Sequence, residues 1–329
     1  MIQTISHAPP SQILVSIAIP LYNKERYFER CFNSVVTQTY KNIECIIVED
    51  CSTDNSLKLA EHLIATYNGN IIFKLIKHKS NCGHAVARNT GVINSNGDYI
   101  YFLDSDDEIT ENCINVLVNL VEKYNEVDIV QGNAYQHPHV ENDRYDFTGL
   151  FPEFTHDSRK IKTYYSKRFP INSWNKLIKK KFIIQNNLYF KPGFIHEDQY
   201  WHYFAIKYIE SFAFTNEYCY IRYFVTDSIS TNSDRSRGIS ANLMIARSML
   251  SNLDIELFEK NLVKIHRLLK RVKREILSDT KYQHFLPECN KLLSKLPNGS
   301  FYLSLAILCE LKKVKNFFRD FSKSNKANE

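Results

Sequence analysis

Short apolar segments alternate with helical patterns along the first third of the chain. Four segments of mostly apolar side chains predict buried strands at residues 13–20, 43–48, 71–76 and 99–103. The segments between them place apolar side chains at helical spacing, at residues 24–39, 54–67 and 83–95. Asp54 is a plausible N-cap of the second helix. Because strands alternate with helices, the pattern predicts β-α-β units and an α/β fold with a mostly parallel sheet.

The pattern becomes less regular after residue 110. It predicts helices at 111–124, at the end of 174–184 and near 197–209, strands at 128–132 and 218–224, and a long polar loop at 136–160. From about residue 238 the chain becomes helical and basic, and the polar segment 230–237 is typical of a linker.

Composition excludes several classes of protein. The 329 residues are 44% hydrophobic and 24% charged, which is typical of a soluble globular protein. A net charge of +6 is too mild to indicate nucleic-acid binding. The eight cysteines are scattered singly, so we expect reduced core thiols in a cytoplasmic protein. We find no signal-peptide pattern and no apolar stretch of about 20 residues, and therefore expect no membrane span.

Carboxylates crowd the end of the fourth predicted strand, in the sequence Y-I-Y-F-L-D-S-D-D-E-I of residues 99–109. Neighbouring carboxylates repel and are costly to desolvate without a positive partner. Mg²⁺ or Mn²⁺ commonly bridges one or two carboxylates to a diphosphate, so Asp104 and Asp106 are candidate metal ligands. The alternative is a solvated acidic turn after a strand.

Other polar side chains follow the first three strands. Ligands of open α/β sheets bind at the carboxyl ends of the strands. There Tyr22 can stack on a base, Asp50 can accept a base N–H, and Arg88 can contact a phosphate. Taken singly, Tyr22 also fits a packing role. The joint placement at four successive strand ends favours a nucleotide site.

Five motifs in sequence order make the chain similar to a known family. They are P-L-Y-N-K, V-E-D-C-S-T-D-N-S, the N-x-G-x-x-x-A-R-N-x-G of residues 81–91, G-D-Y-I-Y-F-L-D-S-D-D and a later E-D. Over roughly residues 14–230 the chain resembles the family 2 glycosyltransferases of the GT-A fold. The resemblance implies an inverting transfer of a sugar from a nucleotide donor, usually a UDP-sugar, to an acceptor hydroxyl. It also implies a setting in bacterial surface polysaccharide, capsule or lipopolysaccharide synthesis.

The resemblance also implies roles for individual residues. Pro20, Tyr22 and Asp50 would hold the nucleobase beside Glu49, and Arg88 would lie near the base or the diphosphate. Asp104, with Ser105, would contact the ribose side, and Asp106 together with Asp104 would bind the Mn²⁺ or Mg²⁺ ion. The family more often has Asp-Asp where this chain has Glu49-Asp50, and Gly where it has Cys51.

A second acidic site is required for an inverting displacement, because a carboxylate must remove the proton of the acceptor hydroxyl. The family's E-D motif falls in H-E-D-Q-Y-W, so Asp198 is the predicted base and Glu197 orients its neighbours. Acidic residues also favour helix N-termini, which is the alternative for this pair. His196 is either a further metal ligand or a surface residue. Trp174 and Lys176 match a segment near the family's acceptor site, although Trp174 fits a core role equally well.

The resemblance suggests a division of the chain. We expect a lead-in at residues 1–11, a GT-A catalytic domain at 12–232, and a basic helical region at 238–329. The catalytic domain would comprise a nucleotide-binding half (12–110) and an acceptor half (111–232). The chain lacks the Q-x-x-R-W motif and the membrane helices of processive synthases in this family, so we expect one sugar per reaction.

Residues 255–277 form a basic amphipathic pattern. The apolar side is predicted to comprise Leu257, Phe258, Leu262, Ile265, Leu268, Leu269, Val272 and Ile276. The basic remainder comprises Lys264, Arg267, Lys270, Arg271, Lys273 and Arg274, and residues 312–319 repeat the theme. Such a helix either lies on an anionic membrane, where lipid-linked glycan acceptors reside, or packs on a domain with a solvated charged face.

Two other functions are alternatives to a glycosyltransferase. A sugar-phosphate nucleotidyltransferase needs a glycine-rich phosphate loop near its first strand, and P-L-Y-N-K does not provide one. The other is a noncatalytic, basic interaction protein that binds anionic lipid or nucleic acid, which an absence of nucleotide binding would favour.

Overall fold

The computed structural model describes residues 13–138, 145–167, 171–225, 235–252 and 258–296. The chain divides into two compact units, residues 1–233 and 234–329, which are described separately. The predicted lead-in at 1–11 and the basic segment at 312–319 lie outside the described residues.

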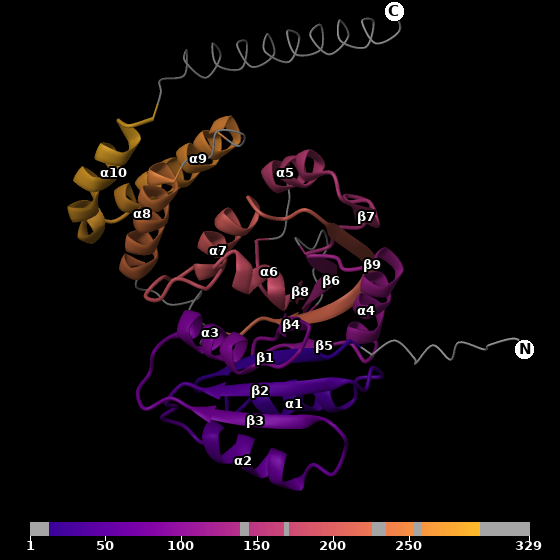
Figure 1. The fold of residues 1–329 in the computed structure, drawn as a ribbon. Coiled ribbons are helices and arrows are strands. Elements are labelled where there is room, and N and C mark those ends of the chain that lie inside the picture. The colour runs from indigo at the N-terminus through magenta and orange to yellow at the C-terminus, as the bar shows by residue number, and fades with distance from the viewer. Residues whose placement is uncertain (1–12, 139–144, 168–170, 226–234, 253–257, 297–329) are drawn as a thin grey trace, which may run out of the picture. The chain divides into compact units, whose positions relative to one another are not determined.

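The first unit is built on a mixed β-sheet with the strand order β3-β2-β1-β4-β8-β6-β9-β5 and with β7 paired to β9 (Figure 1). Its strands are β1 (Val15–Leu21), β2 (Ile43–Glu49), β3 (Ile72–Lys77), β4 (Tyr99–Phe102), β5 (Glu108–Ile109), β6 (Ile129–His137), β7 (Phe154–Thr155), β8 (Lys176–Lys179) and β9 (Phe212–Tyr223). Strands β1 to β4 are all parallel, which confirms the predicted β-α-β half. Strand β8 runs antiparallel to both β4 and β6, while β6 and β9 are parallel.

Seven helices of the described residues accompany this sheet. They are α1 (Phe28–Val36), α2 (Ser56–Thr66), α3 (His84–Asn94), α4 (Cys113–Tyr124), α5 (Ser158–Lys167), α6 (Lys180–Gln185) and α7 (Glu197–Ala205). The cluster that contains Ile17 and Ile19 of β1 includes buried side chains of α1 and α4. The opposite face of β2 packs Ile46 and Val48 against Ala87 of α3. The alternation of side chains along the strands therefore separates α3 from α1 and α4.

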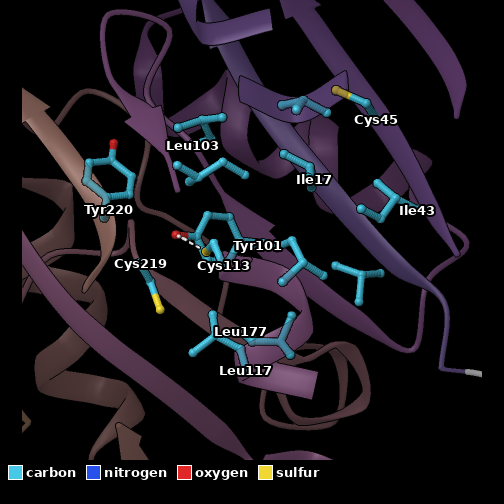
Figure 2. Packing of buried hydrophobic residues seen from close by; sticks show 14 of the residues in the cluster. Ile17, Ile43, Cys45, Tyr101, Leu103, Cys113, Leu117, Leu177, Cys219 and Tyr220 are labelled. Carbon is cyan, nitrogen blue, oxygen red and sulfur yellow. Dashed lines mark hydrogen bonds between the residues drawn. The ribbon is translucent and has the colours of Figure 1, made fainter. Parts of the chain in front are cut away.

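The main core lies between the sheet and the α1–α4 face. Figure 2 shows Ile17, Cys45 and Tyr101 from the sheet close to Cys113 and Leu117 of α4. The Cys113 thiol donates a hydrogen bond to the Tyr101 hydroxyl at 3.4 Å, so the one polar atom of this ring is satisfied inside the core.

Helix α3 lies very close to the central strand. A Cβ added at Gly91 would lie 2.8 Å from the Cβ of Ala18 in β1, so glycine is needed where the helix crosses the sheet. This close approach brings the first turn of α3 to the carboxyl edge of β1 and β2, which is the edge that carries the candidate site.

The structure corrects three local predictions. Residues 176–179 form a strand before the predicted helix, and the segment predicted as a loop, 136–160, contains β7 and the start of α5. The residue that caps α2 is Asn55 rather than Asp54. The Asp54 carboxylate still accepts a hydrogen bond from the Ser56 amide at 2.9 Å. Asp54 therefore contacts the start of the helix as expected, although the N-cap position is one residue later.

The second unit is helical in its described part and comprises α8 (Ser236–Ser251), α9 (Phe258–Leu277), a 3₁₀ helix at Thr280–Phe285 and α10 (Leu286–Leu293). The predicted apolar face of α9 is buried at Leu262, Ile265, Leu268, Leu269, Val272 and Ile276. Arg267, Lys270, Arg271 and Arg274 are exposed. The amphipathic prediction is confirmed for these residues, while the side chains of Leu257 and Phe258 lie outside the described ones.

Two general predictions from composition can also be compared with the structure. No helix among the described residues is long and apolar enough to cross a membrane. Of the seven free cysteines in the described part of the chain, five are buried, whereas Cys51 and Cys82 are exposed. The prediction that all cysteines are core thiols is therefore wrong for these two, which follow polar strand ends rather than lying within strands or helices.

Candidate active site

Arg88 of α3 lies at the centre of the candidate site. Its side chain is only 1% exposed. One guanidinium nitrogen, Nη2, donates to Asp104 Oδ1 at 2.8 Å. The other, Nη1, donates to Glu197 Oε1 at 2.7 Å and to Asp198 Oδ1 at 2.8 Å. Burial opposes the charge of Arg88, but the three carboxylates outweigh it and hold its pKa above the usual value. One cation thus joins the acidic turn after β4 to the first turn of α7.

His84 lies one helical turn before Arg88 and makes a second bridge. Its Nε2 lies 3.4 Å from Asp104 Oδ1, and its Nδ1 lies 3.0 Å from Glu197 Oε1. Burial and the charge of Arg88 oppose protonation, but the hydrogen bonds to Asp104 and Glu197 outweigh them and raise the pKa of His84 to about 9. The imidazole is therefore a cation at neutral pH, and two positive side chains separate the carboxylates of this site.

The neighbouring carboxylates Glu197 and Asp198 have opposite proton affinities. Burial favours the neutral form of Glu197, but the His84 hydrogen bond and the Arg88 charge lower its pKa to about 2. Burial raises the pKa of Asp198 above its usual value despite Arg88, and the nearby charge of Glu197 adds to the increase. Two carboxyl groups whose pKa values are driven apart suit different roles. Asp198 is the better proton acceptor of the pair.

The acidic turn after β4 is neutralised largely by side chains of the protein itself. Lys24 Nζ lies 2.6 Å from Asp106 Oδ2. Arg30 pairs with Glu108 at 2.6 Å, and it also donates to the Asp106 carbonyl at 2.7 Å. Arg88 pairs with Asp104. This corrects the reasoning from the sequence, in which the missing positive partner of the turn was a divalent ion alone.

Asp107 of the same turn is a structural residue. It is buried and accepts hydrogen bonds from the Tyr220 hydroxyl at 2.7 Å and from the Tyr223 amide at 2.8 Å. Burial and the neighbouring charges of Asp106 and Asp104 raise the pKa of Asp107 well above its usual value. This residue anchors the turn to β9 and does not face the candidate site as a ligand.

Asp104 and Asp106, the residues predicted to bind a divalent cation, each have a carboxylate oxygen available for it. Asp104 uses Oδ1 for Arg88 and His84, and Asp106 uses Oδ2 for Lys24. Among the described residues, no donor contacts Asp104 Oδ2 or Asp106 Oδ1. Each carboxylate therefore keeps one oxygen for a hard cation, which prefers oxygen ligands.

The residues predicted to hold the nucleobase lie after β1 and β2. Tyr22 is 40% exposed and its ring is accessible for stacking, whereas Pro20 is buried within β1. Asp50 is buried and already accepts hydrogen bonds, from the Cys82 amide at 2.9 Å and from the Gly83 amide at 2.8 Å. Glu49 and Ser105 are buried, and the Glu49 carboxylate accepts from the Ser52 amide at 2.6 Å.

The predicted acceptor residues lie inside the protein. Trp174 is 7% exposed and stacks on Tyr220 with ring centroids 4.5 Å apart. Lys176 is fully buried, its Nζ donates to the Asn172 carbonyl, and burial lowers its pKa to about 7. Neither presents an open surface to a sugar, and their acceptor role stays a prediction. His196 is an exposed N-cap residue of α7 with φ of +68° and belongs to no three-donor metal group of the described residues.

Sequence reasoning missed three residues of this edge, namely Lys24, His78 and His84. Lys24 was visible as the last letter of P-L-Y-N-K. His84 precedes Arg88 by four residues, a spacing that places both on one helix face. His78 directly follows β3 and lies beside Asp50, with its Nδ1 2.7 Å from Asp50 Oδ1.

Solved structures share this fold. The chain is similar to TarS of Staphylococcus aureus, residues 1–349 in complex with UDP-GlcNAc, with a TM-score of 0.61 and 18% identity over 79% of this chain and 82% of that one. It is also similar to the mannosyltransferase PcManGT of Pyrobaculum calidifontis in complex with GDP-Man and Mn²⁺, with a TM-score of 0.57 and 14% identity over 94% and 84% of the two chains. The α/β architecture is thus that of a GT-A glycosyltransferase.

The sequence comparison identifies the family. The family model described as glycosyl transferase family 2 matches residues 16–186, and the chain belongs to that family. It is 32% identical over 199 residues to glycosyltransferase GlyA of Streptococcus pneumoniae and 30% identical over 197 residues to the uncharacterized glycosyltransferase YibD of Escherichia coli. The matches cover 56% and 57% of this chain, but 27% of GlyA and 54% of YibD. The chain thus spans about a quarter and about half of these relatives.

Proposed function

We propose that the protein is an inverting glycosyltransferase that moves one sugar from a nucleotide-diphosphate sugar to an acceptor hydroxyl. The observation that carries the proposal is the convergence of Asp104, Glu197 and Asp198 on the buried Arg88. It connects the proposed nucleotide-binding half, residues 12–110, with the proposed acceptor half, residues 111–232. A purely structural ion pair would need only one carboxylate, whereas this arrangement holds one acidic residue of the first half and two of the second beside a shared cation.

The proposed reaction is a single displacement with Asp198 as general base. The acceptor oxygen attacks the anomeric carbon, Asp198 takes the hydroxyl proton, and the bond between that carbon and the diphosphate oxygen breaks. Inversion follows because the nucleophile and the leaving group occupy opposite faces of one carbon. Arg88 and Glu197 orient Asp198 through the shared guanidinium nitrogen. Lys24 and His84 place positive charge at the edge where the diphosphate would carry its developing negative charge.

Asp104 and Asp106 are the residues that would hold Mn²⁺ or Mg²⁺ in this proposal, through the oxygens that the protein cations leave open. Such an ion neutralises the charge of the leaving diphosphate. Lys24 pairs with the other oxygen of Asp106 and would hold this carboxylate in place beside the diphosphate.

The proposed donor is a UDP-sugar, with either a hexosyl or an N-acetylhexosaminyl group. The fold similarity to TarS, whose structure contains UDP-GlcNAc, supports the UDP moiety, while PcManGT with GDP-Man illustrates the alternative base. The setting in surface-glycan synthesis is what the family resemblance implies; GlyA and YibD are bacterial glycosyltransferases.

Calorimetry with UDP and Mn²⁺ tests the proposal. We expect UDP binding that Asp106→Ala abolishes or weakens at least tenfold, and donor hydrolysis for one member of a panel of nucleotide sugars. Absence of nucleotide binding in the intact protein would favour the rival interpretation as a noncatalytic interaction protein.

We further propose that the second unit contacts an anionic membrane. Residues 234–329 carry 19 Lys and Arg against 10 Asp and Glu, whereas residues 1–233 carry 23 against 26. Excess basic charge with an exposed row at Arg267, Lys270, Arg271 and Arg274 favours anionic lipid headgroups. This placement would bring a lipid-linked glycan acceptor within reach of the enzyme.

Liposome flotation tests the membrane contact. Neutralising those four residues to Ser should move the protein from anionic vesicles to the soluble fraction. A control that neutralises four exposed cations of the first unit, Arg26, Lys41, Lys58 and Lys181, should float like the unaltered protein. If the two variants floated with anionic vesicles to the same extent, the proposed membrane contact would be disproved.

A further inference from the structure

A group of three different metal-binding side chains lies at the carboxyl ends of β2 and β3, apart from the Asp104–Asp106 pair. Asp50, His78 and Cys82 each offer one ligand atom, and these atoms lie within 4.8 Å of one another. Within the described residues this is the one group of three or more His, Cys, Asp or Glu side chains with that spacing. An oxygen, a nitrogen and a sulfur donor therefore converge on one point.

Strand register explains two of the three positions. Strands β2 and β3 are parallel, and their last paired residues are Glu49 and Lys77. Asp50 and His78 follow this pair directly, so the sheet places them side by side. Cys82 comes from the loop before α3, and its own amide donates to Asp50 Oδ1 at 2.9 Å. The loop that carries the thiol is thus tied to the carboxylate beside it.

The ring of His78 is held by both nitrogens, and a bound ion would replace the proton between Nδ1 and Asp50. Its Nδ1 lies 2.7 Å from Asp50 Oδ1, and its Nε2 lies 3.0 Å from the hydroxyl of Thr90 on α3. Metal-binding histidines usually use their second nitrogen for such an outer contact, which fixes the tautomer and the ring plane. The Asp50 carboxylate is held in the same way, because Gly83 donates its amide to Oδ2 at 2.8 Å.

The donor set selects against the ions proposed for catalysis. Mg²⁺ and Mn²⁺ prefer oxygen ligands, whereas thiolate and imidazole favour Zn²⁺ and chemically similar ions such as Co²⁺. Cys82 is exposed, so its thiol is accessible to an ion from solution. Three protein ligands would leave one tetrahedral position for water, as in open zinc sites.

We propose that Asp50, His78 and Cys82 form a binding site for Zn²⁺ or a similar borderline ion, and that this ion competes with the nucleotide donor. The second part rests on the proposed function, in which Asp50 accepts a base N–H. An ion bound to Asp50 would occupy the carboxylate oxygens that the base needs and would place positive charge against the N–H. The edge of the sheet would then hold a hard-cation site for catalysis and a thiolate site for inhibition.

Absorption spectroscopy of the full chain with Co²⁺ tests the binding site itself. We expect a thiolate-to-cobalt charge-transfer band that disappears on addition of excess Zn²⁺. Cys82→Ser should remove the band and weaken Zn²⁺ binding about 10- to 100-fold, and His78→Gln should weaken binding to a similar extent. The matched control is Cys51→Ser, because Cys51 is also exposed and adjoins Asp50 but lies outside the three-donor group.

Several results would overturn the site. They are the absence of a thiolate band in the unaltered protein, its persistence in Cys82→Ser, or its loss in Cys51→Ser. Thermal unfolding of each variant without metal serves as the folding control. A Cys82→Ser variant that unfolds at a lower temperature would be replaced by Cys82→Ala, which must also lose the band.

Calorimetry with UDP in the presence of Mn²⁺ tests the competition. Zn²⁺ should raise the apparent Kd for UDP at least tenfold in the unaltered protein and in Cys51→Ser, and should have no such effect in Cys82→Ser. If UDP binds and Zn²⁺ leaves its Kd unchanged, the competition is disproved. If UDP does not bind at all, the proposed function fails, whereas the cobalt spectrum still decides the metal site.

Discussion

Two candidate metal sites lie at the same edge of the sheet, the Asp104–Asp106 pair and the group around Asp50, and the partners of their carboxylates give them different chemistry. Asp104 and Asp106 face the charged side chains of Arg88 and Lys24. Asp50 accepts backbone amides from Cys82 and Gly83 and lies beside His78. The carboxylates of the first group are paired with cationic side chains, whereas Asp50 lies beside backbone amides, an imidazole and a thiol.

The comparison teaches that residue type alone does not define a metal site. Asp104 and Asp106 keep two hard oxygens open, so they suit Mn²⁺ or Mg²⁺ with a diphosphate. Asp50 shares its surroundings with nitrogen and sulfur donors, so it suits a softer ion or the N–H of a base. The next experiments separate the two groups by removing one partner at a time.

The largest effect is expected from the cation that unites the first group. Arg88→Met leaves Asp104, Glu197 and Asp198 without their buried partner, and removing one member of such a cluster costs about 3–5 kcal/mol of unfolding free energy. Urea unfolding measures the loss, and transfer activity should disappear with it. Arg88→Lys keeps the positive charge but loses the two guanidinium nitrogens that donate to separate carboxylates. We therefore expect its stability to lie between those of Arg88→Met and the unaltered protein. Unchanged stability in Arg88→Met would mean that the three carboxylates do not depend on this cation.

The second effect concerns the base. Asp198→Asn keeps the shape of the side chain and its contact with Arg88 but removes the proton acceptor, so kcat should fall by about 10²–10⁴. The Kd for UDP, measured by calorimetry, should stay within a factor of two or so. Normal turnover in this variant would place the base elsewhere and leave Asp198 as an acidic residue of the first turn of α7.

The third effect distinguishes the two carboxylate groups directly. Asp106→Ala should weaken Mn²⁺-dependent UDP binding about 10- to 100-fold, because it removes a proposed metal ligand. Cys82→Ser, at the other group, should leave the Mn²⁺ dependence unchanged. If both variants changed the Mn²⁺ dependence equally, the edge would hold one shared metal site instead of two.

The smallest effect is a dependence on pH that arises at His84. Its pKa is about 9 in the folded protein against a usual value of 6.5, so the protonated ring stabilises the fold fully below pH 6.5. This contribution is lost as the pH rises through about 9. The ring is 31% exposed, and solvent screening should limit the loss to below about 2 kcal/mol. Unfolding free energies at pH 6, 8 and 10 measure it, and His84→Gln should flatten the profile.

The dependence of kcat on pH should show a decrease at acid pH, whereas the stability contribution of His84 is lost at alkaline pH. Burial raises the pKa of Asp198, and the base works only when ionised, so kcat should fall as the pH drops through that raised pKa. Asp198→Asn should lose this acid limb together with most of its activity, while an acid limb that persists unchanged would have to come from another carboxyl group.

Local sequence was enough to predict the parallel strands β1 to β4, most of the helices and the polar residues at strand ends. Consecutive apolar residues mark β1 and β2, all seven residues of each strand being buried, because parallel strands are covered on both faces. The same logic placed Asp50, Arg88 and Asp104 at one edge. It could not separate β8 from α6 within residues 176–185, because short apolar segments carry no clear period.

Only the tertiary structure decided which side chains meet. Arg88 and Asp198 are 110 residues apart in sequence and form one ion pair, and His78 reaches Asp50 through strand register. Trp174 and Lys176, which the family resemblance placed near the acceptor site, are buried. The spacing of apolar residues along the sequence predicts which face of a helix or strand a residue occupies. Ion pairs between distant segments depend instead on how packing brings those segments together. The identity of the neighbour, not the residue alone, sets the protonation and ligand chemistry of each carboxylate.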